Sequence, residues 1–193
     1  MLNKMINKKL FQKLKSDYDQ NNQERRQIIS QSNIALHDSK RAIFSLHRFD
    51  IETAQENLNN IEKILANLEK KFGLNRLKDE GAYKAALEEY VEAKLFFLFQ
   101  TKQKIDKIKE LKIDYDSYLG GLCDFTGELV RLGTNMAAKG KIKEFENASQ
   151  TIEDIMAELI NFDLTSYLRT KYDQARNNLR KIEQISYDIN IRK

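Results

Sequence analysis

Hydrophobic residues recur every three or four positions through most of the chain, and the pattern is clearest between residues 51 and 72. This spacing places apolar side chains on one face of an α-helix and predicts that this face lies in a core. Asp50 precedes the segment and suits the N-cap, because its carboxylate can accept a hydrogen bond from a free backbone N–H. Gly73 follows the segment and suits the end of the helix. The apolar positions are Ile51, Ala54, Leu58, Ile61, Leu65, Leu68 and Phe72.

The same periodicity elsewhere in the chain predicts further helices, and no strand is predicted because no segment alternates hydrophobic and polar residues with a period of two. The connections between the predicted helices are short, so neighbouring helices are expected to be antiparallel. The sequence therefore predicts an all-α protein, with residues 1–193 forming a single antiparallel bundle of about seven helices. The other predicted helices cover 2–48 with a break near Asn21–Asn22, 80–111, 116–139 with Asp114 or Asp116 as cap, 142–161 and 164–189.

Composition supports long helices and sets limits on function. The chain has no proline and only seven glycines, so few residues break a helix. The net charge of +4 permits a nucleic-acid partner without requiring one. Cys123 is the single cysteine, which excludes an intramolecular disulfide and a cysteine zinc site and indicates a reducing, cytoplasmic location.

Membrane association is not expected, since no apolar run approaches the roughly 18 residues that a membrane-spanning helix needs. The first residues, MLNKMINKKLFQKLK, carry five lysines and lack the apolar core of a signal peptide. We interpret them as the first turns of a long helix. A transit-like or membrane-surface amphipathic helix is the alternative.

Residues 88–99, EEYVEAKLFFLF, place carboxylates at the border of a strongly apolar run. On a helix, Glu89 and Glu92 share a face with Phe96 and Phe99, which follow one and two turns later. Partly desolvated carboxylates repel each other unless positive charge lies between them. A lysine, an arginine or a metal ion could supply that charge.

A second polar stripe crosses an otherwise apolar helix at residues 118–136. On it, Asp124, Glu128 and Arg131 follow at steps of four and three, with Asn135 one turn later. Each glycine inside a helix costs about 1 kcal/mol relative to alanine, so several of them predict a close approach to the backbone by a neighbouring helix or a bound chain. The glycines in this segment are Gly120, Gly121 and Gly127.

If the two helices face each other, Glu89, Glu92, Asp124 and Glu128 form one cluster of carboxylates. Oxygen ligands without cysteine suit Mg²⁺ or Mn²⁺, and such an ion can activate water and stabilise charge on a phosphate. Spacing alone leaves a solvated or salt-bridged helix face as the alternative, because acids three residues apart are common on surface helices.

Four segments together resemble one known family. They are SKRAIFSLHR (39–48), LEEYVEA (87–93), YLGGLCDFTGELVRLGTN (118–135) and SYLRTKYDQARNNLRKIEQISYDINIR (166–192). In this order they look like the translin family, and specifically its translin-associated factor X (TRAX) branch. The resemblance covers nearly the whole chain.

The resemblance implies a seven-helix domain that assembles into a hollow, octamer-like shell with copies of itself or with a translin-like subunit. It also implies a Mg²⁺-dependent endoribonuclease that acts on single-stranded RNA, with single-stranded DNA as a second ligand. Carried over from TRAX, the residues for catalysis and metal binding are Glu89, Glu92 and Asp124, with Glu128 as the fourth. The translin branch lacks this set. The chain is shorter than eukaryotic TRAX and lacks its long insert, so we expect a compact prokaryotic-type member that acts alone.

Nucleic acid would be held through its phosphates by lysine and arginine, without regard to sequence. Arg131 lies one turn after Glu128, and pairing with that carboxylate is the alternative to contact with phosphate. The other basic candidates are Lys40, Arg41, Arg48, Lys102 and Lys104, the last two in a lysine cluster that extends to Lys112.

Three other functions compete with this one. Arg41 and His47 are similar to the Arg-x4–6-His motif of HEPN ribonucleases, which need no metal. A shell that binds RNA without chemistry would use the acids only for structure. A ferritin-like di-metal oxidase needs Glu-x-x-His pairs, which neither His37 nor His47 provides.

Overall fold

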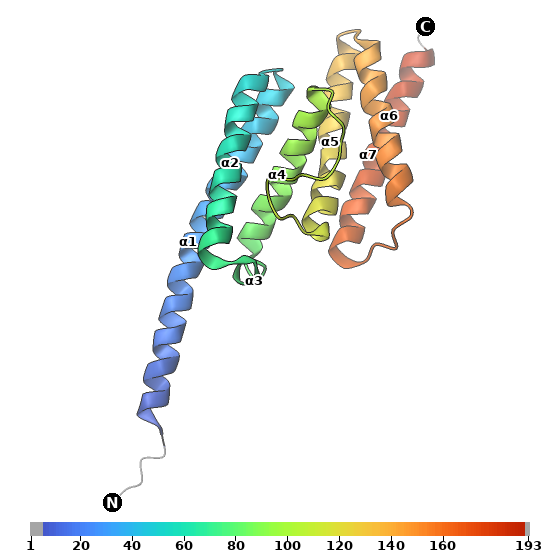
Figure 1. The fold of residues 1–193 in the computed structure, drawn as a ribbon. Coiled ribbons are helices and arrows are strands. Elements are labelled where there is room, and N and C mark those ends of the chain that lie inside the picture. Colours follow the sequence, from blue (N-terminus) through green and yellow to red (C-terminus); the bar gives the residue numbers. More distant parts are fainter. Residues whose placement is uncertain (1–5, 192–193) are drawn as a thin grey trace, which may run out of the picture.

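The protein is a bundle of helices in the computed structural model, which describes residues 6–191 (Figure 1). Within these residues there are seven α-helices and no strand, which confirms the predicted all-α class. None of the described helices is both long enough and apolar enough to cross a membrane. The helices are α1 (Lys8–His47), α2 (Ile51–Phe72), α3 (Leu74–Leu77), α4 (Gly81–Gln100), α5 (Tyr115–Ala138), α6 (Ile142–Leu159) and α7 (Ser166–Ile191).

Several predicted helix ends are confirmed. The Asp50 side chain accepts a hydrogen bond from the Thr53 backbone N–H at 3.1 Å, so it caps α2. Gly73 ends that helix with a φ of 76°, a conformation that glycine adopts without strain. Asp114 caps α5 by accepting from the Ser117 N–H at 2.8 Å. The break predicted near Asn21–Asn22 is wrong, since α1 runs through it, and residues 2–5 of that prediction lie outside the described residues.

The helix predicted over 80–111 is too long, because α4 ends at Gln100. Lys102 has a φ of 56°, and the Gln103 N–H turns back to the Leu98 oxygen at 2.8 Å, as in a helix C-cap motif. Residues 101–114 then return along the bundle without forming a helix (Figure 1). Ile108 and Leu111 of this segment are buried against the core. The apolar spacing of three residues therefore reflects the packing of an extended segment.

This crossover segment, residues 101–114, makes α4 and α5 parallel, so the antiparallel orientation expected for these two helices is wrong. Figure 1 shows both helices starting at the lower end of the bundle. The packing agrees, because Gly120 lies against Glu88 and Gly121 against Val91 further along α4. A short connection would have made α5 run antiparallel to α4. The extended crossover instead returns the chain to the end of the bundle where α4 begins, so α5 runs in the same direction as α4.

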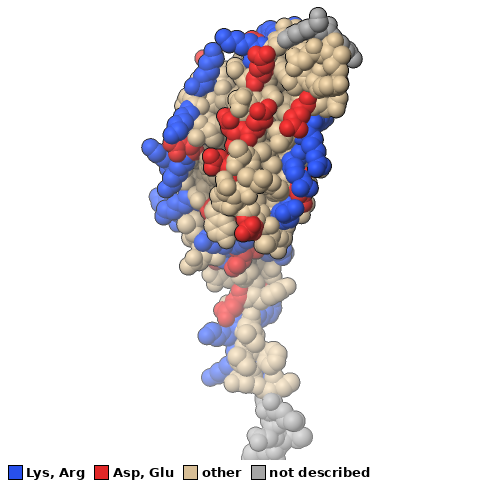
Figure 2. Space-filling model, turned by 90° about the vertical axis from the view of Figure 1, so that its right-hand side faces the viewer, with Lys and Arg blue, Asp and Glu red and all other residues tan. Residues whose placement is uncertain are grey.

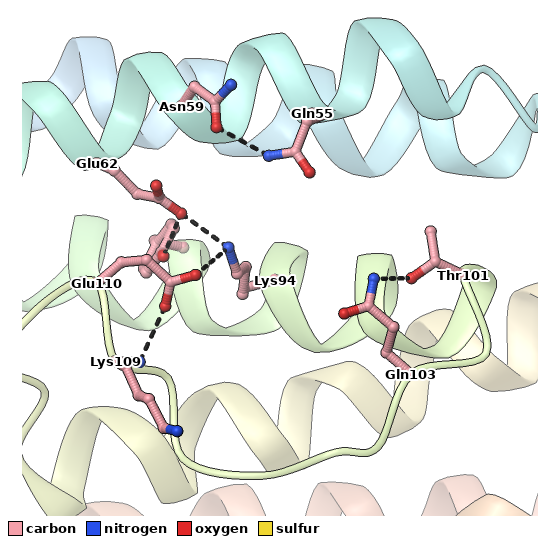
Figure 3. Close-up of polar contacts among 9 residues, drawn as sticks. Gln55, Asn59, Glu62, Lys94, Thr101, Gln103, Lys109 and Glu110 are labelled. Carbon is pink, nitrogen blue, oxygen red and sulfur yellow. Dashed lines mark hydrogen bonds and ion pairs between the residues drawn. The ribbon is translucent and has the colours of Figure 1, made fainter.

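A buried lysine fastens the crossover segment to the bundle (Figure 3). The Lys94 Nζ of α4 lies 2.9 Å from Glu62 Oε1 of α2 and 2.8 Å from Glu110 Oε1 of the crossover. Tyr90 also donates its hydroxyl to Glu62 at 2.7 Å. Burial opposes the charge on Lys94, but the hydrogen bonds to Glu110 and Glu62 outweigh it and raise the pKa of the ammonium. The ion pairs therefore join three segments that are distant in sequence.

The apolar run of α4 lies at the centre of the core. Phe96 is fully buried, with its ring centroid 4.8 Å from that of His47 of α1 and 6.3 Å from that of Phe125 of α5. Because α4 packs against helices on both sides, it is apolar all round near this end and has no single polar face.

Replacing Gly121 by alanine is expected to lower the free energy of unfolding by about 2–3 kcal/mol. A Cβ atom there would lie 2.7 Å from the Glu88 backbone oxygen and 2.7 Å from the Val91 Cβ, so α4 and α5 would have to separate. Gly127 is the matched control, since its nearest neighbour would be Asn178 Nδ2 at 3.5 Å and alanine there should stabilise by up to about 1 kcal/mol. Urea unfolding measures both, and equal effects would contradict the close helix contact.

Candidate acidic site between helices α4 and α5

The four predicted carboxylates come together although the helix orientation differs from the prediction. On α4, Glu92 is buried with 9% of its surface exposed, and Glu89 is half-buried. Asp124 and Glu128 are half-buried on the facing side of α5. Because α4 and α5 run parallel, Glu89 and Glu92 lie beside Asp124 and Glu128 in the same order along the two helices. Residues three or four positions apart share one helix face, which keeps the two carboxylates of each pair together.

The electrostatics show that the four side chains share one site. Burial, and then the charges of Glu89, Asp124 and Glu128, raise the pKa of Glu92 to about 9, although Lys171 opposes them. Burial also raises the pKa of Glu89, while Lys40 favours its ionised form. Glu92 therefore carries a proton at neutral pH in the protein without a bound ion.

A lysine from α7 supplies positive charge at one side of the cluster. Lys171 makes an ion pair with Asp124, and its Nζ lies 2.6 Å from Glu88 Oε1. Tyr167 also hydrogen bonds to Glu88 Oε1 through its hydroxyl at 2.7 Å. Burial opposes the charge on Lys171, but its hydrogen bonds to Asp124 and Glu88 outweigh this and raise its pKa. Asp124 and Glu88 are thus bridged by an ammonium.

A histidine from α1 closes the other side of the cluster. His47 Nε2 hydrogen bonds to Glu128, and the imidazole packs against Phe96. Arg131 Nη1 lies 3.5 Å from the same carboxylate, with about half of the Arg131 side chain exposed. The pairing with Glu128 that was the alternative for Arg131 is therefore present, and contact with phosphate stays a prediction.

The other basic residues predicted for nucleic-acid binding lie in different places. Lys40 is exposed on α1 and acts on Glu89. Arg41 Nη1 pairs with Asp38 at 2.9 Å, and the Arg48 guanidinium lies 5.7 Å from the Phe44 ring centroid. In the crossover segment, Lys102 lines a separate cavity of about 840 Å³ and Lys104 lies 3.7 Å from Asp106. Of these five residues, the structure links Lys40 alone directly to the carboxylates.

The donor set fits a divalent cation in its chemistry and its charge. All four side chains offer carboxylate oxygens, which Mg²⁺ and Mn²⁺ prefer. A bound cation would offset the acidic charges that, after burial, raise the pKa of Glu92. In the described part of the chain, however, no three acidic, histidine or cysteine side chains are arranged to hold a metal ion as they stand. Asp124 points to Lys171 and Glu128 to His47, so both would have to turn toward the ion.

Sequence reasoning missed Lys171, the cation that the apposed acids require. The sequence did contain a signal for it. Lys171 is the first residue of the Lys-Tyr-Asp stretch in the last predicted helix, within a segment that resembles the translin family. Its partner Glu88 belongs to the same acidic segment as Glu89 and Glu92, but no role followed from spacing. The pairing needs α7 to lie beside α4 and α5, which the sequence pattern does not specify.

The stability of the metal-free protein is expected to fall as pH rises from about 5 to about 9. In this range the unfolded chain has released the Glu92 proton, whereas the folded protein keeps it because its pKa is raised to about 9. The folded state then binds more protons, so this group lowers the free energy of unfolding by up to about 1.4 kcal/mol per pH unit. Urea unfolding in EDTA should show a shallower slope for Glu92→Gln, and an equal slope would contradict the buried proton.

The surface on the α6 and α7 side, seen in Figure 2, has acidic side chains gathered near its middle and lysine and arginine along its edges. An acidic surface repels phosphate. The exposed acids of α6 therefore make this helix a poor nucleic-acid surface. They are Glu146 and Glu153, together with Glu144, Asp154 and Glu158, which line the cavity of about 840 Å³.

The chain is similar to known proteins of one family over most of its length. The profile of the Translin family matches residues 23–193. The chain is 27% identical to the translin-associated protein X homolog of Schizosaccharomyces pombe over 92% of this chain and 85% of that protein. It thus aligns with a TRAX protein over most of both lengths.

Solved structures show the same fold. The crystal structure of AfC3PO superposes with a TM-score of 0.85 at 20% sequence identity and covers 95% of this chain and 98% of that one. A structure of AfC3PO in complex with duplex RNA superposes with a TM-score of 0.82 at 19% identity, over 95% of this chain and 97% of that one.

Proposed function

This chain belongs to the translin family, and from that premise we propose that it is a Mg²⁺- or Mn²⁺-dependent endoribonuclease that cuts single-stranded RNA. The observation that carries the proposal is the cluster of Glu89, Glu92, Asp124 and Glu128, in which burial, and then the charges of the other three acids, raise the pKa of Glu92 to about 9. Asp124 is paired with Lys171, and Glu128 with His47 and Arg131, whereas burial and the neighbouring acids keep Glu92 protonated. The similarity to a TRAX homolog over 92% of the chain supports the same conclusion.

The residues have distinct roles in the proposed reaction. Glu89, Glu92 and Asp124 would hold the cation, which supplies Lewis acidity and a nucleophilic water near neutral pH. Glu128 accepts the proton of the attacking water, and His47, hydrogen bonded to Glu128, orients that carboxylate. Lys171 pairs with Asp124 from α7 in the protein without a bound ion, and Asp124 would turn from this lysine toward the cation.

Positive charge near the cluster would position the RNA. Lys40 is exposed beside Glu89, and Arg131 is half-exposed beside Glu128, so both can reach a phosphate next to the carboxylates. Such contacts neutralise the backbone and carry no base specificity. The structure of AfC3PO with duplex RNA supports RNA as the ligand. Single-stranded DNA and an octamer-like shell, formed by this chain alone or with a translin-like subunit, belong to the same proposal.

The proposal is tested by incubating the purified protein with an end-labelled single-stranded RNA in Mg²⁺ and in EDTA. Cleavage in Mg²⁺ that stops in EDTA is the expected result. Cleavage that persists in EDTA would refute the metal mechanism and direct attention to Arg41 and His47. Those two residues have different surroundings, since about three quarters of the Arg41 side chain is exposed whereas His47 is bound to Glu128.

A non-catalytic RNA-binding shell is the second candidate. One observation favours it: among residues 6–191, no three potential ligands are arranged to hold an ion as they stand. In that case Asp124 and Glu128 serve to bind Lys171 and His47, and they stabilise the packing of α5 against α7 and α1. Tight RNA binding by the wild-type protein without any cleavage in Mg²⁺ or Mn²⁺ would select this candidate.

A further inference from the structure

A second cavity lies at the end of the bundle where α4, α5 and α7 begin. Its volume is about 660 Å³, within the range of about 300–1,000 Å³ that is usual for small-molecule sites. Figure 1 shows these three helix starts close together at the lower end of the bundle. The lining includes Lys84 and Glu88 of α4, Tyr115, Asp116 and Ser117 of α5, Asp163 and Thr165 just before α7, and Tyr167 of α7.

Two tyrosines on this cavity expose much of their surface. Tyr115 is 73% exposed and Tyr167 is 56% exposed, although both are large aromatic side chains. Tyr115 directly follows Asp114, whose carboxylate fixes the first turn of α5 through the Ser117 N–H. Tyr167 is held by its hydroxyl, 2.7 Å from Glu88 Oε1, and by Lys171 Nζ, 5.4 Å from its ring centroid. Two aromatic rings on fixed helix starts thus border one cavity.

The cavity is connected to the acidic site through shared side chains. Glu88 lines the cavity and also accepts from Lys171 Nζ at 2.6 Å, and Lys171 pairs with Asp124 of the cluster. A ligand in the cavity would therefore lie next to the place where we expect the scissile phosphate. A ligand that occupies both places must put a phosphate at the acidic site and a flat group in the adjacent cavity. A single-stranded polynucleotide does this with its backbone and one of its bases.

We propose that this cavity is a nucleobase subsite, in which a base of single-stranded RNA stacks on Tyr115 and Tyr167 while its backbone enters the acidic site. The proposal rests on the proposed function and adds to it a site for the base. Aromatic rings bind bases through their π-faces, and this works for every base. Hydroxyls of Ser117 and Thr165 and the Lys84 ammonium can meet the polar edge of the base.

The test uses binding in EDTA, so that cleavage plays no part. A single-stranded RNA containing 2-aminopurine reports stacking because its fluorescence falls when the base stacks. With the wild-type protein we expect quenching on binding. Tyr115→Leu and Tyr167→Leu should each reduce the quenching and weaken binding by about 5- to 100-fold. Tyr167→Phe keeps the ring and should retain the quenching.

Tyr187→Leu is the matched control, since Tyr187 is 61% exposed on α7 and is absent from the cavity lining. It should bind and quench like the wild type, and circular dichroism checks that every variant keeps its helices. Wild-type binding without quenching, or both leucine variants within twofold of the wild type, would overturn the subsite. Quenching that depends on the tyrosines, in a protein that never cleaves RNA in Mg²⁺, would support the subsite while refuting the nuclease.

Discussion

The double variant Glu92→Gln/Asp124→Asn is expected to lose Mg²⁺-dependent RNA cleavage by about a thousand-fold or more while it still binds RNA. Both substitutions remove oxygens that would hold the cation. A bound cation contributes several kcal/mol to a hydrolytic transition state, and about 4 kcal/mol corresponds to a thousand-fold in rate. The variant should still fold, because Glu92 with a pKa of about 9 is already uncharged at neutral pH and glutamine has nearly the same shape. Lys171 also keeps its ion pair with Glu88 when Asp124 becomes asparagine. Single-turnover cleavage and filter binding measure the two properties separately.

A control variant with the same chemistry is available on α6. Glu146→Gln/Asp154→Asn makes the same two substitutions at exposed positions of α6, and it should cleave at the wild-type rate. If the cluster variant retained more than about a tenth of the wild-type rate, the catalytic role of the acids would be refuted. Loss of both cleavage and RNA binding would instead indicate that the acids have a structural role.

The Lys171→Met variant is expected to be less stable than the wild type by about 2–3 kcal/mol in EDTA. Methionine replaces the apolar stem of the lysine but leaves Glu88 and Asp124 without their ammonium, and both carboxylates are largely buried. The cost is set below that of a fully buried pair because Asp124 keeps 25% of its side chain exposed. Mg²⁺ should restore part of the stability, because a cation bound to the native state replaces the lost charge. Urea unfolding with and without Mg²⁺ measures both effects.

Lys94→Met is the matched control, since Lys94 is also a buried ammonium between two carboxylates (Figure 3). It should also destabilise the protein. Its partners Glu62 and Glu110 lie apart from the four-acid cluster, so Mg²⁺ should restore much less stability. An equal Mg²⁺ effect on the two variants would show that the cation acts on exposed charge in general, and that the cluster has no particular affinity.

Local patterns predicted most of the helices correctly because they depend on neighbours in sequence. The three- and four-residue spacing, the Asp50 cap and the Gly73 end placed α2 correctly. The error at residues 101–111 has a physical cause. Apolar residues three positions apart can also be buried when an extended segment runs over the core. Lys94 binds Glu110 of this extended segment. Spacing alone does not distinguish these two outcomes.

Part of the acidic site could also be predicted because it depends on neighbours in sequence. Acids three or four residues apart must share a helix face, so each pair could be identified from spacing. Their meeting followed from assuming that consecutive helices pack together, and this holds for parallel as well as antiparallel helices. The partners Lys171 and His47 come from α7 and α1, at positions 47 residues after Asp124 and 81 residues before Glu128. No local pattern relates residues that far apart.

By itself, the sequence determined the helical class, most helix boundaries and the two acidic faces, because backbone capping and side-chain periodicity act over a few residues. Only the tertiary structure decided the parallel orientation of α4 and α5, the bridging of Glu88 and Asp124 by Lys171, and the raised pKa of Glu92. These features depend on burial and on charges brought together from distant segments. Desolvation and Coulomb energy are set by distance in space, which the order of residues along the chain does not give.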